Sequence, residues 1–230
     1  MNLHGFGPQL LLGTLMTVRL ALSAVSVGLV LGLLGATAKS SRHATLRLMG
    51  EGYTTIVRGI PELLMVLIVY FGSSTMIGAV LRQFGIDTYV ELGPFLSGTV
   101  ALGLTFGAYA TEVFRGALLT VPRGQIEAAQ SLGLGRWHCF HRIVLPQLWR
   151  IALPGLGNLF MVLLKDTALI SVVGLDEIMR KAQIAVGDTR EPFTFYGCAA
   201  LIYLGLTVVT SGGLMALEHR ANRGYRRARS

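Results

Sequence analysis

Five stretches of the chain are predominantly apolar over about 20 residues each, the length that a helix needs to cross a bilayer. The composition agrees with membrane insertion: 52% of the residues are hydrophobic and 14% are charged, against about 25% charged residues in soluble domains. The mean hydropathy is +0.59. The sequence therefore predicts an all-α integral membrane protein with spans at about 10–36, 60–80, 92–111, 148–173 and 193–217.

The basic residues predict the orientation of these spans. Fourteen Lys and Arg residues fall in the first connection, the third connection and the C-terminal tail, and four fall in the second and fourth connections. Because cytoplasmic loops carry an excess of Lys and Arg, the N terminus is expected outside and the C terminus in the cytoplasm. The first basic residue is Arg19, so the N-terminal run lacks the basic start of a signal peptide and is interpreted as a retained helix.

Several other functions are not indicated by the sequence. The basic residues, which give a net charge of +8, lie between apolar runs rather than in one patch that would bind nucleic acid. Cys139 and Cys198 form no CxxC pair, and His138 and His141 have no third ligand nearby, so neither a disulfide nor a metal site is expected. The chain has no HExxH motif, nucleophile elbow or pair of catalytic carboxylates, and no phosphate-binding G-x-x-x-x-G-K-[ST] motif, so it is expected not to hydrolyse ATP itself.

The most informative polar segment is EAAQSLGLGRWHCFHRIVLP, residues 127–146. It predicts a short helix over 125–132, a Gly-Leu-Gly break at 133–135, and a second helix that ends at Pro146. Apolar residues fall on one face of each helix. A small helical projection with a rigid corner is suited to docking into a cleft of another protein.

Ionisable residues inside a span are costly and usually face a cavity or a partner. Lys165, Asp166 and Thr167 lie in the fourth predicted span, beyond the bilayer midplane and near a helix weakening expected at 154–157. The two charges and the hydroxyl could meet the two charges of an amino acid, which makes the three residues candidates for a substrate path. Alternatively, Lys165 and Asp166 pair with other side chains and only stabilise the structure.

Other charged residues have structural or gating roles in this interpretation. Pro61 suits the first turn of a helix, and Glu62 behind it favours the helix dipole. Glu112 and Arg115 are three residues apart and can pair. Arg58 precedes Pro61, and Arg19 lies inside the first span, where it could reach the membrane surface or an acid of a partner. The structural or gating candidates are Arg58, Pro61, Glu62, Glu112 and Arg115.

Small residues recur every four positions in two spans. Gly28 and Gly32 do so in the first span, and Thr99, Gly103, Gly107 and Thr111 do so in the third. This spacing lets helix backbones approach closely in lipid, so we expect these faces to pack against other helices.

Three longer segments carry a family resemblance: EGYTTIVRGIPELLMVLIVYFG, GAYATEVFRGALLTVPRGQIEAAQSLG and ALPGLGNLFMVLLKDTALISVVGLDEIMRKAQ. With residues 127–146 they resemble the membrane subunits of polar amino acid ABC importers. They are most similar to the Q-type permease of histidine/lysine/arginine/ornithine systems, with opine permeases close behind. The resemblance covers about residues 8–220 and implies one type I (MetI-like) permease domain, followed by a basic cytoplasmic tail at 221–230.

The resemblance also implies how such a chain works. It would be a multi-pass protein of the bacterial inner membrane, with two ATPase subunits that use ATP and Mg, a second homologous permease subunit or a second copy of itself, and a periplasmic binding protein. The chain itself would be a transport subunit and not an enzyme, and it would bind no cofactor. The polar segment would be the cytoplasmic coupling loop, at about 122–146. Its ATPase-coupling residues would be Glu127, Ala128, Ala129, Gly133, Ile143, Leu145 and Pro146.

The substrate expected from the resemblance is a polar, basic amino acid. Asp166 departs from the histidine-type pattern, in which a small polar residue would follow the lysine, and this leaves room for another ligand. The alternatives are an opine permease, a membrane-embedded enzyme that uses Lys165 and Asp166, and a secondary transporter. The last is weakened because five helices without a repeat make a poor two-repeat carrier.

Overall fold

The computed structural model describes residues 3–84 and 92–222, and all regular structure within them is helical, as predicted. Residues 223–230 of the predicted basic tail lie outside the described residues. Two short segments are not α-helical: η1, a π-helical turn, and η2, a 3₁₀ helix. The elements are α1 (Gly7–Lys39), α2 (Ala44–Gly59), α3 (Glu62–Gln83), α4 (Pro94–Thr120), α5 (Arg123–Ser131), α6 (Arg136–Cys139), η1 (Phe140–Val144), α7 (Leu145–Asp166), η2 (Thr167–Val173), α8 (Ile178–Thr189) and α9 (Pro192–Ala221).

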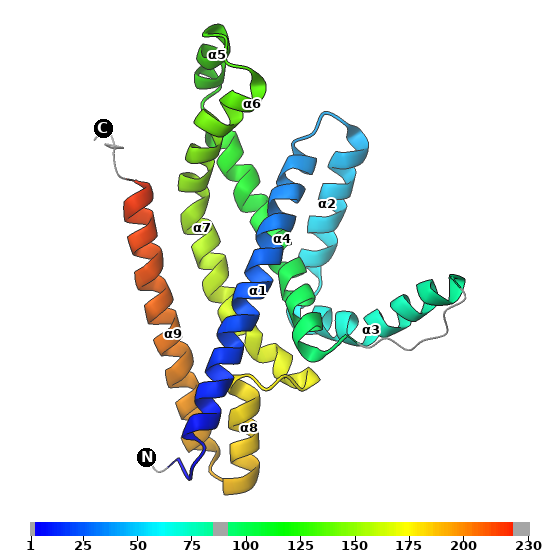
Figure 1. Ribbon diagram of the computed structural model, residues 1–230, viewed down its shortest axis with the longest axis vertical. Coiled ribbons are helices and arrows are strands. Elements are labelled where there is room, and N and C mark those ends of the chain that lie inside the picture. The colour runs from blue at the N-terminus through cyan, green and yellow to red at the C-terminus, as the bar shows by residue number, and fades with distance from the viewer. Residues whose placement is uncertain (1–2, 85–91, 223–230) are drawn as a thin grey trace.

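Helices α1 and α4 form the most extensive contact in the molecule and cross at its centre (Figure 1). A Cβ atom on Gly28 would lie 2.6 Å from Cδ1 of Phe106 and 3.0 Å from the carbonyl oxygen of Gly103. A Cβ atom on Gly107 would lie 2.8 Å from Cβ of Leu31 and 3.2 Å from the carbonyl oxygen of Gly28. The close packing predicted from the repeated small residues is therefore confirmed for both helices.

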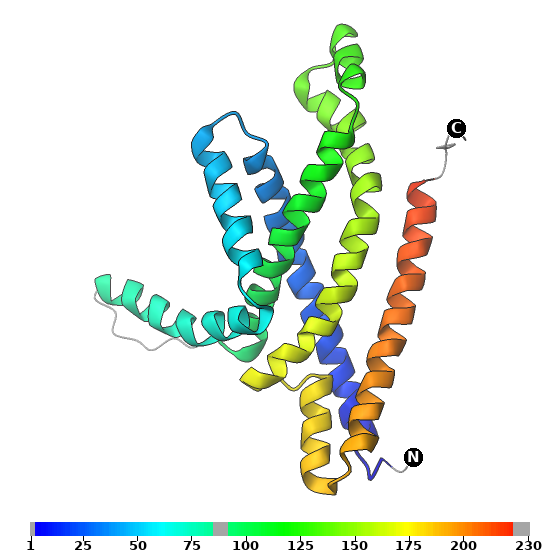
Figure 2. The same cartoon turned by 180° about the vertical axis from the view of Figure 1, so that it is seen from behind.

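The first connection between spans contains a helix that the sequence interpretation missed. Helix α2 packs against α1 and α4, with Gly50, Thr54 and Val57 on its buried face. Ile60 and Pro61 then adopt extended backbone, and α3 begins at Glu62. In both views α3 leaves the bundle instead of running beside α1 (Figures 1 and 2).

Helix α7 is continuous through Pro154, so the weakening expected at 154–157 is wrong. The glycines there serve packing instead. A Cβ atom on Gly155 would lie 2.9 Å from Cγ1 of Val113 in α4, and one on Gly157 would overlap the side chain of Leu214 in α9. Close neighbours on two sides hold the helix in shape, and its irregular turns lie at its two ends, in η1 and η2.

Four helical segments of the described chain are long and apolar enough to cross a membrane: Gly7–Lys39, Glu62–Gln83, Arg136–Val173 and Pro192–Ala221. Helix α4 covers the remaining predicted span, at 92–111, but is not among them; it is rich in small and hydroxyl side chains, and it is the helix most enclosed by others. Helix α9 packs on α7 and α8 and leaves many apolar side chains exposed, among them Leu201, Leu204, Val208 and Val209.

Candidate functional site

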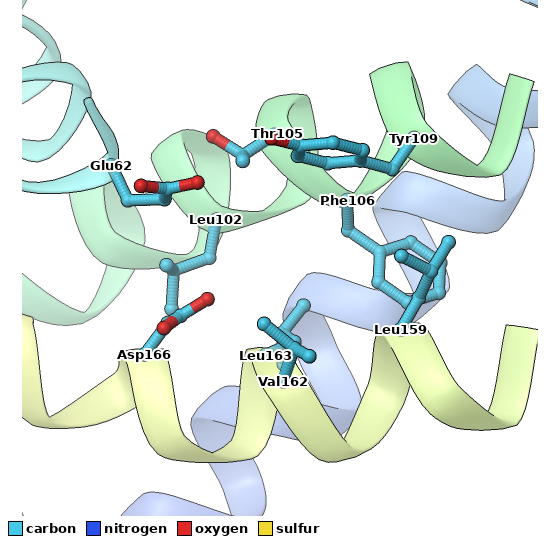
Figure 3. A pocket seen from close by; sticks show the side chains of 9 residues that line it. All are labelled: Glu62, Leu102, Thr105, Phe106, Tyr109, Leu159, Val162, Leu163 and Asp166. Atoms are coloured by element: carbon cyan, nitrogen blue, oxygen red, sulfur yellow. The ribbon is translucent and has the colours of Figure 1, made fainter. Parts of the chain in front are cut away.

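A pocket of about 270 Å³ lies where the start of α3, the middle of α4 and the end of α7 meet. Its two carboxylates, Glu62 and Asp166, face each other near one end, and the rings of Phe106 and Tyr109 lie toward the other (Figure 3). The rest of the wall is largely aliphatic. The full lining is Glu62, Leu102, Thr105, Phe106, Tyr109, Leu159, Val162, Leu163 and Asp166.

Glu62 reaches this pocket because the chain breaks just before it. The extended backbone at Ile60 and Pro61 ends α2 and starts α3, and Glu62 is the first residue of the new helix. Its predicted position in the first helical turn is confirmed, where an acid complements the helix dipole. The sequence did not reveal that the same carboxylate also lines a pocket with Asp166, since that pairing joins two distant segments.

The three consecutive candidates for a substrate path point to different surroundings. Asp166 lines the pocket, whereas Lys165 is exposed and Thr167 is buried with its hydroxyl donating to the carbonyl of Leu164 at 2.8 Å. Neither Lys165 nor Thr167 is part of the pocket lining. The pocket therefore uses one of the three, together with Glu62 from another helix.

A cation lies over the ring of Tyr109. The guanidinium carbon of Arg58, in the last turn of α2, is 5.1 Å from the centroid of that ring. Tyr109 belongs to the pocket lining, so the pocket has acidic groups near one end and an arginine over a ring of its wall.

The polar segment folds as two short helices joined by a tight turn at the far end of the molecule from the N terminus (Figure 1). Gly133 has φ of 80°, a conformation that residues with a Cβ atom resist, so the break predicted at 133–135 is confirmed. Glu127 and Ala128 are exposed on α5, and Ala129 is buried. On the other side of the turn, the Trp137 side chain is 70% exposed and its ring lies 4.2 Å from that of His141.

Pro146 does not end the second helix, contrary to the sequence interpretation. It lies in the first turn of α7, and the helical path runs from Arg136 through η1 to Asp166. Proline has no N–H to donate, so it fits a position where the pattern of hydrogen bonds already changes. The N–H of Leu145 donates to the carbonyl of Phe140, five residues back, as in a π turn. One helical rod thus connects the polar turn with the pocket.

A charge cluster joins α1, α2 and α4 on the side of the pocket nearer the polar turn. The predicted contact of Glu112 with Arg115 is present at 3.4 Å between Oε2 and Nε. Glu112 also accepts from the ammonium of Lys39, which in turn lies 3.0 Å from Oγ1 of Thr54. The contribution of Lys39 was missed because it lies in a distant helix.

Glu177 is a buried acid at the start of α8, and the sequence interpretation missed its role. Its carboxylate accepts from the backbone N–H groups of Met179 and Arg180 at 2.9 and 2.8 Å, and from the Tyr203 hydroxyl at 2.9 Å. Thr17 of α1 accepts from the N–H of the next residue at 3.3 Å. Burial raises the pKa of Glu177, while these donors act in the opposite direction. Glu177 and the N–H of Ile178 thus link the start of α8 to α9 and α1 by hydrogen bonds.

The family described as "Binding-protein-dependent transport system inner membrane component" matches residues 28–223. The chain belongs to this family. It is thus a multi-pass inner-membrane permease subunit of an ATP-binding-cassette transporter, a transport component and not an enzyme. The enzyme and secondary-transporter alternatives are set aside by this assignment, and the type I (MetI-like) permease fold is confirmed.

The permease is similar over nearly its whole length to curated relatives. It is 48% identical over 223 residues to "Nopaline transport system permease protein NocQ" of Agrobacterium fabrum, covering 96% of this chain and 94% of that protein. It is 47% identical to "Octopine transport system permease protein OccQ" of Rhizobium meliloti, with 99% and 98% covered. Identity is 42% to "Histidine/lysine/arginine/ornithine transport system permease protein HisQ" of Salmonella typhimurium, with 98% and 99% covered.

Solved structures agree with the fold. The permease matches a chain of "Crystal structure of an amino acid ABC transporter with histidines" with a TM-score of 0.78 and 34% identity, covering 93% of this chain and 94% of that one. It also matches a chain of the MetNI methionine ABC transporter in an inward-facing form, with a TM-score of 0.70 and 16% identity over 94% of both chains. The second likeness supports the fold alone.

Proposed function

We propose that this permease imports a polar amino acid or amino acid derivative with a cationic group, and that the pocket between Glu62 and Asp166 holds this cation. The observation that carries the proposal is the pair of carboxylates on one mostly apolar pocket. Two like charges in surroundings of low polarity repel each other and lose hydration. A guanidinium or ammonium group between them offsets both costs and forms charge-assisted hydrogen bonds.

The names of the relatives support the same substrate class. They specify nopaline, octopine, or histidine, lysine, arginine and ornithine. Octopine and nopaline are arginine derivatives that keep the guanidinium group and carry additional carboxylates. Arginine and its derivatives therefore share the group that a pair of acids would bind. Within this class the first choice is a basic amino acid, and an opine is the alternative.

The helical rod that begins at the polar turn suggests how ATP would drive the pocket open and closed. We infer that an ATPase subunit contacts the turn through the exposed residues Glu127, Ala128 and Gly133, while the buried Ala129 packs beneath them and supports the turn. Ile143, Leu145 and Pro146 lie where η1 meets α7 and would transmit the movement. Because Asp166 ends α7, a tilt of the rod would move one wall of the pocket relative to Glu62. The partner would hydrolyse ATP.

The orientation proposed from the basic residues is compatible with this arrangement. The polar turn and the end of α9 lie at one end of the molecule, and the start of α1 lies at the other (Figure 2). In the proposed assembly two ATPases lie on the cytoplasmic side, with a second permease chain beside this one. A periplasmic binding protein delivers the substrate from the side of the N terminus.

Two measurements test the proposal. The chain is affinity-purified from gently solubilised native membranes, and its partners are identified by mass spectrometry; an ATPase and a second permease are expected. The purified complex is then titrated calorimetrically with L-arginine, octopine, nopaline and L-glutamate. A cationic ligand should bind and L-glutamate should not. Absence of an ATPase where other ABC complexes survive would contradict the assembly, and binding of L-glutamate alone would contradict the substrate class.

A further inference from the structure

The acidic pocket has no partner for the carboxylate of a cationic amino acid or opine. Amino acids and opines carry at least one carboxylate, and Glu62 and Asp166 repel it. The remaining lining has only hydroxyl groups as polar side chains, those of Thr105 and Tyr109. The Thr105 hydroxyl already donates to the carbonyl of Ala101 at 3.1 Å. A substrate that satisfies the acids therefore needs a cation near the other end of the pocket.

Arg58 is placed to supply this cation. Its guanidinium carbon lies over the ring of Tyr109, at 5.1 Å from the centroid, and Tyr109 lies toward the end of the pocket away from the two carboxylates (Figure 3). The Arg58 side chain is exposed, and among the described residues no carboxylate forms an ion pair with it. Within residues 3–84 and 92–222, the contact of its guanidinium is with the ring of Tyr109.

The contact with the ring leaves the N–H donors of the guanidinium available. A cation–π contact requires no hydrogen bond, and the N–H donors of a guanidinium match the two oxygens of a carboxylate. The ring also holds the charge in place, so that less side-chain freedom is lost when a ligand arrives. Arg58 is in the last turn of α2 and Glu62 is the first residue of α3, so the two charges flank the extended backbone at Ile60 and Pro61.

We propose that Arg58, held by Tyr109, binds the carboxylate of the substrate and makes the permease select amino acids over the corresponding amines. The inference rests on the proposed function, because it assumes that the substrate cation lies between Glu62 and Asp166. It adds a residue that determines specificity at the other end of the same pocket. An amino acid is then bound through its cation and its carboxylate, whereas a cationic amine without a carboxylate interacts only with Glu62 and Asp166.

The test uses two probes that differ only in the carboxylate, L-arginine and agmatine, which is decarboxylated arginine. Binding of each to the purified complex, without binding protein, is measured by calorimetry for the wild type and Arg58→Gln. The matched control is Arg47→Gln, which removes another exposed arginine of α2. The wild type should bind L-arginine about tenfold to a hundredfold more tightly than agmatine. Arg58→Gln should remove this preference by weakening L-arginine binding and leaving agmatine binding unchanged.

The possible outcomes separate this inference from the proposal on which it rests. Equal weakening of both probes by Arg58→Gln, or no effect on either, would overturn the role of Arg58. Asp166→Asn should weaken both probes, and if it does so the cation site stands whatever Arg58→Gln shows. If Asp166→Asn has no effect, the cation site itself is wrong. If neither probe nor any opine binds the wild-type complex, both proposals fail.

Discussion

Glu62 at the start of α3 and Asp166 at the end of α7 line one pocket, although they lie in distant parts of the sequence (Figure 3). Each carboxylate belongs to a different helix, so the pocket exists only while α3, α4 and α7 keep their present arrangement. A change of this arrangement would separate the two acids and weaken their hold on a cation. The site is thus sensitive to the same helix movements that a transport cycle requires.

Neutralising either acid should weaken the binding of a cationic substrate. Each charged hydrogen bond contributes about 1.5–3 kcal/mol, so Asp166→Asn and Glu62→Gln should each raise the Kd for L-arginine about tenfold to a hundredfold. The double variant should lose less than the product of the two effects, because both acids serve one cation. Calorimetric titration of the purified complex gives these values. Asp188→Asn, which changes an exposed acid of α8, is the matched control.

Reversing the charge at Glu127 should disrupt assembly without affecting membrane insertion. Glu127 is exposed on α5, beside the turn at Gly133, so the change costs little in the isolated chain. In a docked complex, a misplaced charge costs several kcal/mol. The ATPase recovered with Glu127→Arg should fall about tenfold or more, at an unchanged permease yield. Glu51→Arg, at an exposed position on α2, serves as the control. Normal recovery and transport with Glu127→Arg would remove this residue from the docking surface.

Filling the contact between α1 and α4 should destabilise the fold. A methyl group at Gly28 would meet Phe106 and the backbone of Gly103, and overpacking of this kind costs about 1–3 kcal/mol. Gly28→Ala should therefore lower the Tm of the purified protein in detergent. Gly205→Ala is matched, since it adds the same methyl group to a membrane helix where no atom lies within 4 Å. Equal Tm values for the two variants would show that α1 and α4 can move apart to accommodate the methyl group without loss of stability.

Much of the helical layout could be predicted because apolar length and small-residue spacing are properties of single segments. The runs that became α1, α3, α7 and α9 are visible from hydropathy, and the glycine pattern identified the packing faces of α1 and α4. Helix α2 was missed because it is amphipathic and too short for a span. The end of the second helix at Pro146 was misplaced because proline fits the first turn of a helix as well as it ends one.

The pocket could be predicted only in part. Asp166 was recognised as a candidate for the substrate path because an acid inside an apolar span is costly and usually functional. Glu62 was not, because its position at a helix start is already explained by the helix dipole. Their meeting depends on how α3 and α7 lie against α4, which no local pattern specifies. The contact of Arg58 with Tyr109 and that of Lys39 with Glu112 are of the same kind, since each joins residues from different helices.

The stability of the permease should depend on the protonation of Glu177. Burial raises the pKa of this carboxyl above its ordinary value of 4.5, so between these two values the folded chain holds a proton that the unfolded chain has lost. The free energy of unfolding contributed by this group is therefore complete below about pH 4.5 and falls as the pH rises through the raised pKa.

Glu177→Gln should remove this part of the pH dependence, because its amide does not titrate. The variant should also be less stable, since an amide nitrogen replaces one of the two accepting oxygens: either the one that accepts from Arg180 or the one that accepts from Met179 and Tyr203. Melting temperatures in detergent, measured from about pH 4.5 upward, compare the slope of this variant with that of the wild type and of Asp188→Asn. Only Glu177→Gln should flatten the curve. An unchanged slope would mean that Glu177 stays ionised over the whole range, held by its three donors against the cost of burial.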